Sequence, residues 1–180
     1  MSYARRESFL PFTRPVLGQE EIEEIIDSIH SGWITTGPKA ARFEAELQTY
    51  NGVPHCLVMN SATTAQEITL QCLGLKPGDE VITTSLTWVS TLSTVILQGG
   101  VPVLVDIDPK TMNLDPALLE AAITPRTVGI IPVHLTGLPC PMEAVWEVAG
   151  KHGLWVVEDA AQAMGARYKG RKIGSDPRSV

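Results

Sequence analysis

Apolar residues recur along this chain with two different spacings. Over residues 19–32 and 38–52 they return every three or four positions, which is the period of a helix that buries one face. Similar helical stretches are predicted at residues 61–73, 87–98, 115–123 and 141–151. Short apolar or β-branched runs lie between these stretches and predict strands at residues 55–59, 80–84, 101–107, 127–135 and 154–159.

The alternation of strand and helix predicts an α/β fold. Parallel strands need crossover connections, and the helices that make these connections cover both faces of the sheet. We therefore expect three layers with a mostly parallel sheet in the middle. The polar segment 166–174 predicts a hairpin around Lys169 and Gly170. No internal repeat or linker interrupts the sequence, so residues 1–180 are expected to belong to one domain.

The composition is typical of a soluble globular protein. Of the 180 residues, 44% are hydrophobic and 19% are charged, and a net charge of −6 without a basic stripe disfavours nucleic-acid binding. No apolar run is long enough to cross a bilayer, and the polar start of the chain does not resemble a signal peptide. Cys56, Cys72 and Cys140 are scattered without CxxC spacing, which favours buried thiols in a reducing cytoplasm and no metal site.

Polar segments follow four of the predicted strands. In an open α/β sheet, ligands bind at the carboxyl ends of the strands, so these segments are expected at one edge. They read MNSATTA, TSLTWVS, HLTG and EDAAQA. In the last segment, Glu158 and Asp159 end an apolar run. Burying a carboxylate without a partner is costly, so we expect a cation at this strand end.

Each of these segments also has a purely structural interpretation. Asn60 and Ser61 are favoured helix N-caps, although the same helix start also forms an anion site. Trp88 suits ordinary packing as well as stacking on a flat heteroaromatic ring. Asp159 could cap the following turn. His134 is expected to be a polar residue with its hydrogen bonds satisfied at a strand end, rather than a catalytic group.

Three familiar motifs are disfavoured. The segment GWITTGPK resembles a phosphate-binding P-loop, but Pro38 and Ala40 break its pattern. No GxGxxG follows a strand, which disfavours a dinucleotide-binding fold. Asp106 and Asp108 follow a predicted strand, as in aspartate phosphotransferases, but Pro109 favours a turn there.

Taken together, five segments resemble one family. They read SGWITTGPK, NSATTA, LGLKPGDEVITTSLTWVSTL, AITPRTVGIIPVHLTG and HGLWVVEDAAQAMGARYKGRKIGS. The chain resembles the amino-terminal part of the DegT/DnrJ/EryC1/StrS sugar aminotransferases, which use pyridoxal 5′-phosphate (PLP). The resemblance implies the large domain of the fold type I aminotransferases, incomplete at its carboxyl end and without the small domain. It also implies a cytoplasmic homodimer.

The resemblance implies a role for each polar segment. Asp159 would pair with the protonated pyridine nitrogen of PLP, Trp88 would stack on the ring, and Gln162 would bind its phenolate oxygen. The phosphate would be held by Ala62, Thr63 and Thr64. The family often has Gly-Thr-Ala at this triplet, and some relatives have His in place of Gln162. The sugar nucleotide would contact the loop formed by Trp33, Ile34, Thr35, Thr36 and Gly37.

The reaction implied is transfer of an amino group from glutamate, which becomes 2-oxoglutarate, to a nucleotide-linked keto sugar. Three segments look most like members that aminate a UDP-4-keto-pentose for lipid A modification: FLPFTRP, SGWITTGPK and TWVSTL. In the family, a Schiff-base lysine follows an SFH-like segment, which we expect beyond Val180. None of the six lysines present is a credible substitute. Two alternatives stay open, a catalytically inactive binding or assembly module and a sugar dehydratase with histidine in place of that lysine.

Overall fold

The computed structural model describes residues 8–11 and 13–180. Two parts of the chain lie outside the described residues: residues 1–7 and Phe12. The prediction that the start is not a signal peptide concerns residues 1–7, and Phe12 belongs to the segment FLPFTRP. The chain divides into two compact units, Met1–Arg42 and Phe43–Val180. Each unit is described by itself below.

The first unit contains α1 (Gln19–His30) and the start of α2 (Pro38–Asn51). The α1 helix begins where the Gly18 amide donates to the Glu21 carboxylate, at 2.6 Å. The α2 helix begins at a proline, which is tolerated at a first helical position. The Lys39 ammonium pairs with carboxylates of α1, at 2.9 Å from Asp27. Both helices predicted for this region are confirmed, and the isoleucine stripe of α1 is exposed.

The second unit is built on one four-stranded sheet. Its strands are β1 (Glu80–Thr84), β2 (Val101–Val105), β3 (Thr127–Ile130) and β4 (Trp155–Val156). They lie in the order β2-β1-β3-β4, and every neighbouring pair is parallel. The predicted parallel sheet is confirmed, although the strands are shorter than the apolar runs that predicted them.

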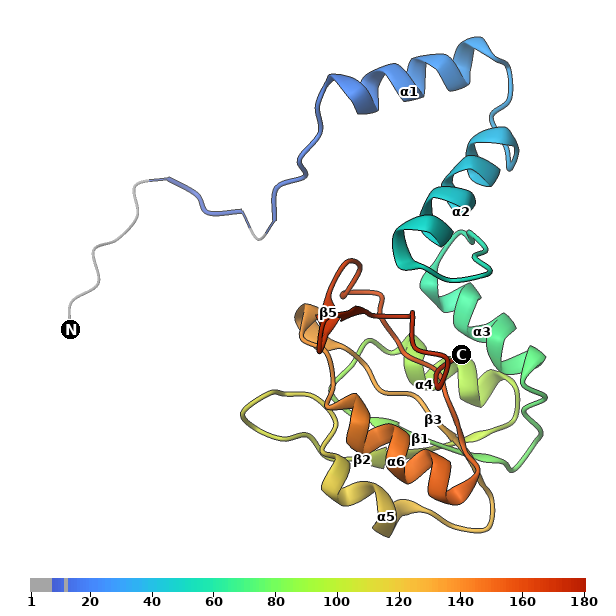
Figure 1. The fold of residues 1–180 in the computed structure, drawn as a ribbon, viewed down its shortest axis with the longest axis vertical. Helices are drawn as coiled ribbons and strands as arrows, with labels where there is room; N and C mark the ends of the chain where they lie inside the picture. The colour runs from blue at the N-terminus through green and yellow to red at the C-terminus, as the bar shows by residue number, and fades with distance from the viewer. Residues whose placement is uncertain (1–7, 12) are drawn as a thin grey trace. The chain divides into compact units, whose positions relative to one another are not determined.

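Helices cover both faces of this sheet (Figure 1). One face carries α3 (Ala62–Cys72) and α4 (Ser90–Leu97). The other carries η1 (Pro116–Leu118), α5 (Leu119–Ala122) and α6 (Met142–His152). Neighbouring residues of β1 point to opposite faces, so that Val81 packs with Leu70 and Val95, whereas Ile82 packs with Leu119 and Val145. The three-layer α/β prediction is confirmed.

The predicted strand at residues 55–59 is wrong. This segment pairs with no other strand among the described residues, and Leu57 is 75% exposed. Its Val58 amide donates instead to the Glu44 side chain, at 2.9 Å. An apolar run indicates burial, but a strand also needs a neighbouring backbone with which to form its ladder of hydrogen bonds. The sequence pattern carries no information about that neighbour.

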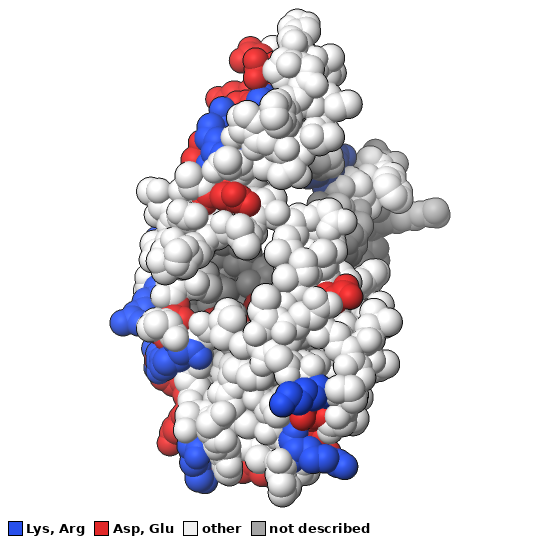
Figure 2. All heavy atoms as spheres, turned by 90° about the vertical axis from the view of Figure 1, so that its right-hand side faces the viewer, with Lys and Arg blue, Asp and Glu red and all other residues white. Residues whose placement is uncertain are grey.

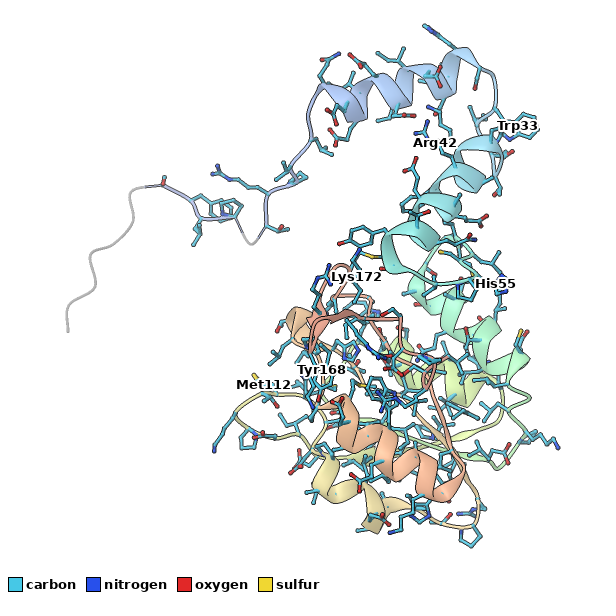
Figure 3. The ribbon with its side chains drawn as sticks, viewed as in Figure 1. Trp33, Arg42, His55, Met112, Tyr168 and Lys172 are labelled. Carbon is cyan, nitrogen blue, oxygen red and sulfur yellow. The ribbon has the colours of Figure 1, made fainter. Side chains whose placement is uncertain are left out.

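The predicted hairpin is confirmed by β5 (Arg167–Tyr168) and β6 (Arg171–Lys172). Its turn places Lys169 and Gly170 at φ 47° and 84°, the left-handed conformations of a tight hairpin turn. Tyr168, labelled in Figure 3, packs edge-on against a tryptophan of α6. The centroids of the Tyr168 and Trp146 rings are 6.3 Å apart. The hairpin is thereby fixed to the helical layer.

Candidate functional site

The order of the strands creates a crevice at the carboxyl edge of the sheet. The neighbouring strands β1 and β3 lead to helices on opposite faces, β1 to α4 and β3 to α6, so the connections at their carboxyl ends diverge. Ligands bind at such topological switch points. A cleft of about 420 Å³ lies here, which we call the switch-point cleft. Five of the predicted cofactor residues line it: Ala62, Thr63, Trp88, Asp159 and Gln162. The sixth, Thr64, does not line it.

The start of α3 forms one wall of the switch-point cleft. Ser61 is the N-cap, and its hydroxyl accepts a hydrogen bond from the Thr64 amide at 3.1 Å. The capping interpretation is therefore confirmed. The Thr64 amide is used by the cap, and Thr64 does not line the cleft. The amides of Ala62 and Thr63 begin the helix and have no intrahelical acceptor. These two amides, with the positive end of the helix dipole, form a site suited to an anion.

Asp159 stands on the opposite wall and is held from several sides. The Thr91 hydroxyl donates to one carboxylate oxygen at 3.0 Å, and the Ala161 amide donates to the other at 3.2 Å. The Asp159 backbone amide donates to the Pro132 carbonyl at 2.9 Å. Each carboxylate oxygen has two lone pairs, so this arrangement fixes the side chain and leaves it able to accept a further donor from the cleft.

Trp88 and Gln162 complete the polar and aromatic lining of the cleft. Trp88 lies between β1 and α4 and is 72% exposed, so its indole is available for stacking. The Gln162 carbonyl oxygen accepts a hydrogen bond from the Thr136 amide at 2.7 Å. Because the carbonyl is occupied in this way, the amide nitrogen of Gln162 keeps its two protons for another acceptor.

The neighbouring carboxylate, Glu158, already has a partner. Its side chain is 4% exposed, and one oxygen lies 2.8 Å from His134 Nε2. His134 Nδ1 accepts from the Cys140 amide at 3.1 Å, so Nε2 must carry the proton that is donated to Glu158. The prediction that His134 is a satisfied polar residue is confirmed. Burial raises the pKa of the adjacent Cys140 thiol to about 12. Cys140 is buried as predicted, whereas Cys56 is half-buried and Cys72 is exposed, so the prediction of buried thiols is wrong for these two.

The sequence interpretation missed Gln66, which lines the cleft, and Thr91, which contacts Asp159 without lining the cleft. Thr91 is the hydroxyl donor to Asp159, and it also lies 2.9 Å from the Thr87 hydroxyl. Gln66 lines the cleft from α3 and is 9% exposed. A signal for Gln66 was present, because it occupies a position of the apolar stripe that continues with Leu70 and Leu73. A polar residue inside an apolar stripe is a candidate for binding a ligand.

The predicted substrate loop belongs to the first unit. It runs from Trp33 to Gly37, and Trp33 Nε1 donates to the Thr36 carbonyl at 2.9 Å. A side chain at position 37 would collide with the Trp33 indole, which explains the glycine. Trp33 lies at the bend between α1 and α2 (Figure 3), and the loop lines a groove together with Lys39 and Arg42. The structure thus places this loop in a different unit from the switch-point cleft.

The surface carries charges of both signs. On the face shown in Figure 2, acidic and basic side chains are interspersed and do not gather in one patch. Within residues 8–11 and 13–180, no group of three or more His, Cys, Asp or Glu residues is placed to hold a metal ion. Across the same part of the chain, no helix is both long and apolar enough to span a membrane.

Comparison with known families identifies the chain. The model of the DegT/DnrJ/EryC1/StrS aminotransferase family matches residues 15–177. The chain belongs to this family. The predicted family is confirmed, and so is the fold class, because related solved structures are PLP-dependent aminotransferases of fold type I.

Three relatives illustrate the likeness. The chain is 48% identical over 171 residues to the spore coat polysaccharide biosynthesis protein SpsC of Bacillus subtilis. It matches Spr1654 of Streptococcus pneumoniae in its pyridoxamine phosphate (PMP) form, with TM-score 0.89 and 38% identity over 92% of the chain. It also matches DesI, solved in the presence of its TDP-sugar product, with TM-score 0.77 and 36% identity over 85% of the chain.

The chain spans less than half of these family members. It covers 44% of SpsC, 45% of Spr1654 and 39% of DesI. Among the described residues, no lysine lines the switch-point cleft. Four of the six lysines have partners elsewhere: Lys39 with Glu24 and Asp27, Lys151 with Glu120, Lys169 with Glu143, and Lys172 with Tyr50.

Proposed function

We propose that this chain is the cofactor-binding part of a PLP-dependent aminotransferase that acts on a nucleotide-linked keto sugar, with glutamate as the amino donor. One observation carries the proposal: Asp159 is fixed at the end of a parallel strand and lines the same cleft as Trp88 and the start of α3. Membership of the aminotransferase family and the sugar-nucleotide product of DesI support the substrate class. The lipid A pentose and the homodimer stay predictions from resemblance.

The residues of the switch-point cleft fit PLP by their donor chemistry. The free amides of Ala62 and Thr63, with the Thr63 hydroxyl, suit a phosphate dianion. The exposed indole of Trp88 suits the face of a heteroaromatic ring. The anionic side chain of Asp159 suits a protonated ring nitrogen, and the free amide protons of Gln162 suit the phenolate oxygen. The phosphate, the ring nitrogen and the phenolate oxygen of PLP thus each have a complementary group in the cleft.

When bound, PLP supplies a ring that withdraws electrons and carries the amino group between the two substrates. In this proposal, Asp159 keeps the ring nitrogen protonated, because a nearby negative charge favours the charged form of that nitrogen. Thr91 and the Ala161 amide hold the carboxylate in place for this task. Trp88 limits movement of the ring, and α3 anchors the phosphate.

The proposal assigns the Schiff-base lysine to the complete enzyme and not to this chain. No lysine lines the described cleft, and the chain covers 44% of SpsC. We therefore expect the 180-residue chain to bind PMP reversibly and to be inactive by itself. Reduction with borohydride in the presence of PLP, followed by mass spectrometry, should detect no stoichiometric pyridoxyl adduct on any of the six lysines. An adduct on one specific lysine would contradict this assignment.

The function is tested on the complete enzyme that contains this sequence. It is incubated with glutamate and a panel of nucleotide-linked keto sugars, with simple keto acids as controls, and the products are identified by mass spectrometry. We expect an amino sugar nucleotide together with 2-oxoglutarate. Amination of the keto acids alone would exclude a sugar substrate. A dehydrated sugar without amination would instead identify the dehydratase alternative.

A further inference from the structure

Gln66 carries a buried amide that has no hydrogen-bond partner. Among the described residues, three buried polar side-chain atoms lack a partner: Gln66 Nε2, Glu143 Oε2 and Glu158 Oε1. Glu143 Oε2 nevertheless lies 2.9 Å from the Lys169 ammonium, so its charge is compensated. Glu158 uses its other oxygen for His134. Gln66 Nε2 is the one hydrogen-bond donor of the three.

This unpaired donor is costly, and packing does not explain it. Burying an amide without a partner is unfavourable, and an apolar side chain at this position would avoid that penalty. Leu70, one turn farther along the same face of α3, is fully buried in the apolar layer. A leucine at position 66 would continue that stripe. The amide is therefore explained better by a partner that occupies the cleft than by the folding of α3.

The direction of helical side chains indicates where that partner lies. Side chains on an α-helix lean toward its amino terminus, so a residue covers the turn that precedes its own Cα. Gln66 lies one turn after Ala62 and lines the same cleft as Ala62 and Thr63. The Gln66 side chain is therefore directed toward the start of α3, where the backbone amides of Ala62 and Thr63 lie. Nε2 itself is buried, and because the last torsion of glutamine is broad, a rotation about this torsion brings its protons toward an acceptor there.

We infer that Gln66 Nε2 donates a hydrogen bond to the phosphate group of the ligand in the switch-point cleft. Two features are brought together: an unpaired donor that is nine-tenths buried, and the anion-binding start of an 11-residue helix. The inference rests on the proposed function, because the phosphate is that of the cofactor. It adds Gln66 to the phosphate site as a positioning residue.

The test compares two ligands that differ only in the phosphate. The 180-residue chain and its Gln66→Leu variant are titrated with PMP and with pyridoxamine by isothermal titration calorimetry. We expect Gln66→Leu to weaken PMP binding about tenfold or more, as for a lost hydrogen bond to a charged group, and to change pyridoxamine binding less than twofold. The ³¹P chemical shift of bound PMP should also move.

A matched control is available in Gln98. Its amide nitrogen donates to the Glu67 carbonyl at 2.8 Å, and it does not line the cleft. Gln98→Leu should leave PMP affinity unchanged and lower the melting temperature. Gln66→Leu should keep or raise the melting temperature of the ligand-free chain, because it removes an unpaired buried donor.

Each other outcome overturns a defined claim. If Gln66→Leu binds PMP as tightly as the original chain, the amide contacts no phosphate and the inference is wrong. If PMP and pyridoxamine lose affinity equally, the substitution acts through the shape of the cleft, and the inference is again wrong. If the original chain binds pyridoxamine as tightly as PMP, α3 anchors no phosphate, and the proposed cofactor site fails together with the inference.

Discussion

The two ends of β1 both carry buried polar groups, but these groups are paired differently. At the amino end, the Glu80 carboxylate accepts hydrogen bonds from Thr124, Arg126 and Thr127, so both of its oxygens are used. At the carboxyl end, the switch-point cleft contains an unpaired amide on Gln66 and an exposed indole on Trp88. The same sheet therefore has one end where Glu80 finds all its partners within the chain and one end where a buried amide, that of Gln66, has none.

This difference separates structural polar residues from residues kept for binding. A buried group with all its partners within the chain contributes to stability and requires no ligand. A group without a partner reduces stability and is retained where it serves another purpose. Substitutions at the amino end should therefore change stability, and substitutions at the carboxyl end should change affinity.

The largest effect is expected at Asp159. Asp159→Asn keeps the shape of the side chain but removes the charge that pairs with the ring nitrogen. Affinity for PMP and for pyridoxamine should fall about 10- to 100-fold, as for a lost hydrogen bond to a charged group worth about 1.5–3 kcal/mol. Calorimetric titration measures both ligands. Unchanged affinity for both would show that Asp159 is not the partner of the ring.

The next effect is a change of stability at Glu80. The Thr124 hydroxyl and then the Arg126 guanidinium hold the pKa of Glu80 below its ordinary value of 4.5. A depressed folded-state pKa contributes stability that is fully present above pH 4.5 and is lost as the pH falls through the lower value. Glu80→Gln should therefore lower the urea midpoint at pH 7, and the deficit should shrink toward pH 3.

The control for this prediction is Glu147, which is exposed on α6. Glu147→Gln should leave the urea midpoint unchanged at both pH values. Glu80→Gln should also keep the PMP affinity of the original chain, because Glu80 lies at the opposite end of β1 from the cleft. A loss of affinity with unchanged stability would contradict the distinction between the two ends.

The smallest effect is expected at Thr91, which holds Asp159 without lining the cleft. Thr91→Val keeps the shape but loses the hydroxyl. We expect a loss of about 1 kcal/mol of stability and about fivefold weaker PMP binding. Thr94→Val is the matched control, because Thr94 is equally buried on α4 but donates to the Ser90 carbonyl of its own helix. Equal affinities for the two variants would contradict the positioning role of Thr91.

The successes and failures of the sequence interpretation follow from the range of the interactions involved. Helices α1 to α4 and α6 were predicted within a few residues, because apolar spacing and capping residues act over one or two turns. Residues 127–135 were predicted as one strand, yet only Thr127–Ile130 form β3. Beyond β3, Val133 forms an isolated parallel bridge with Asp159. Strand length depends on the neighbouring strand, which a local pattern does not describe.

The candidate site shows the same distinction between local patterns, which could be predicted, and long-range contacts, which could not. Asp159, Trp88 and the start of α3 could be proposed from the sequence, because polar residues after apolar strands meet at one edge of a parallel sheet. The partners of these residues could not. The contact of Thr91 with Asp159 joins positions 68 residues apart, and the pairing of His134 with Glu158 joins positions 24 residues apart. Both contacts exist only because β1, β3 and β4 end side by side.

Apart from the strand predicted at residues 55–59, the sequence by itself determined the order of the helices and strands, the parallel sheet and the edge at which the cleft lies. These follow from local periodicity and from the short connections between elements. The tertiary structure alone decided which polar groups are paired and which are left for a ligand. Glu158 and Asp159 are adjacent in the chain and both line the cleft. Glu158 is paired with the buried His134, whereas Asp159 accepts from the Thr91 hydroxyl and can accept a further donor from the cleft. Pairing depends on the three-dimensional neighbours of each side chain, and those neighbours come from distant parts of the chain.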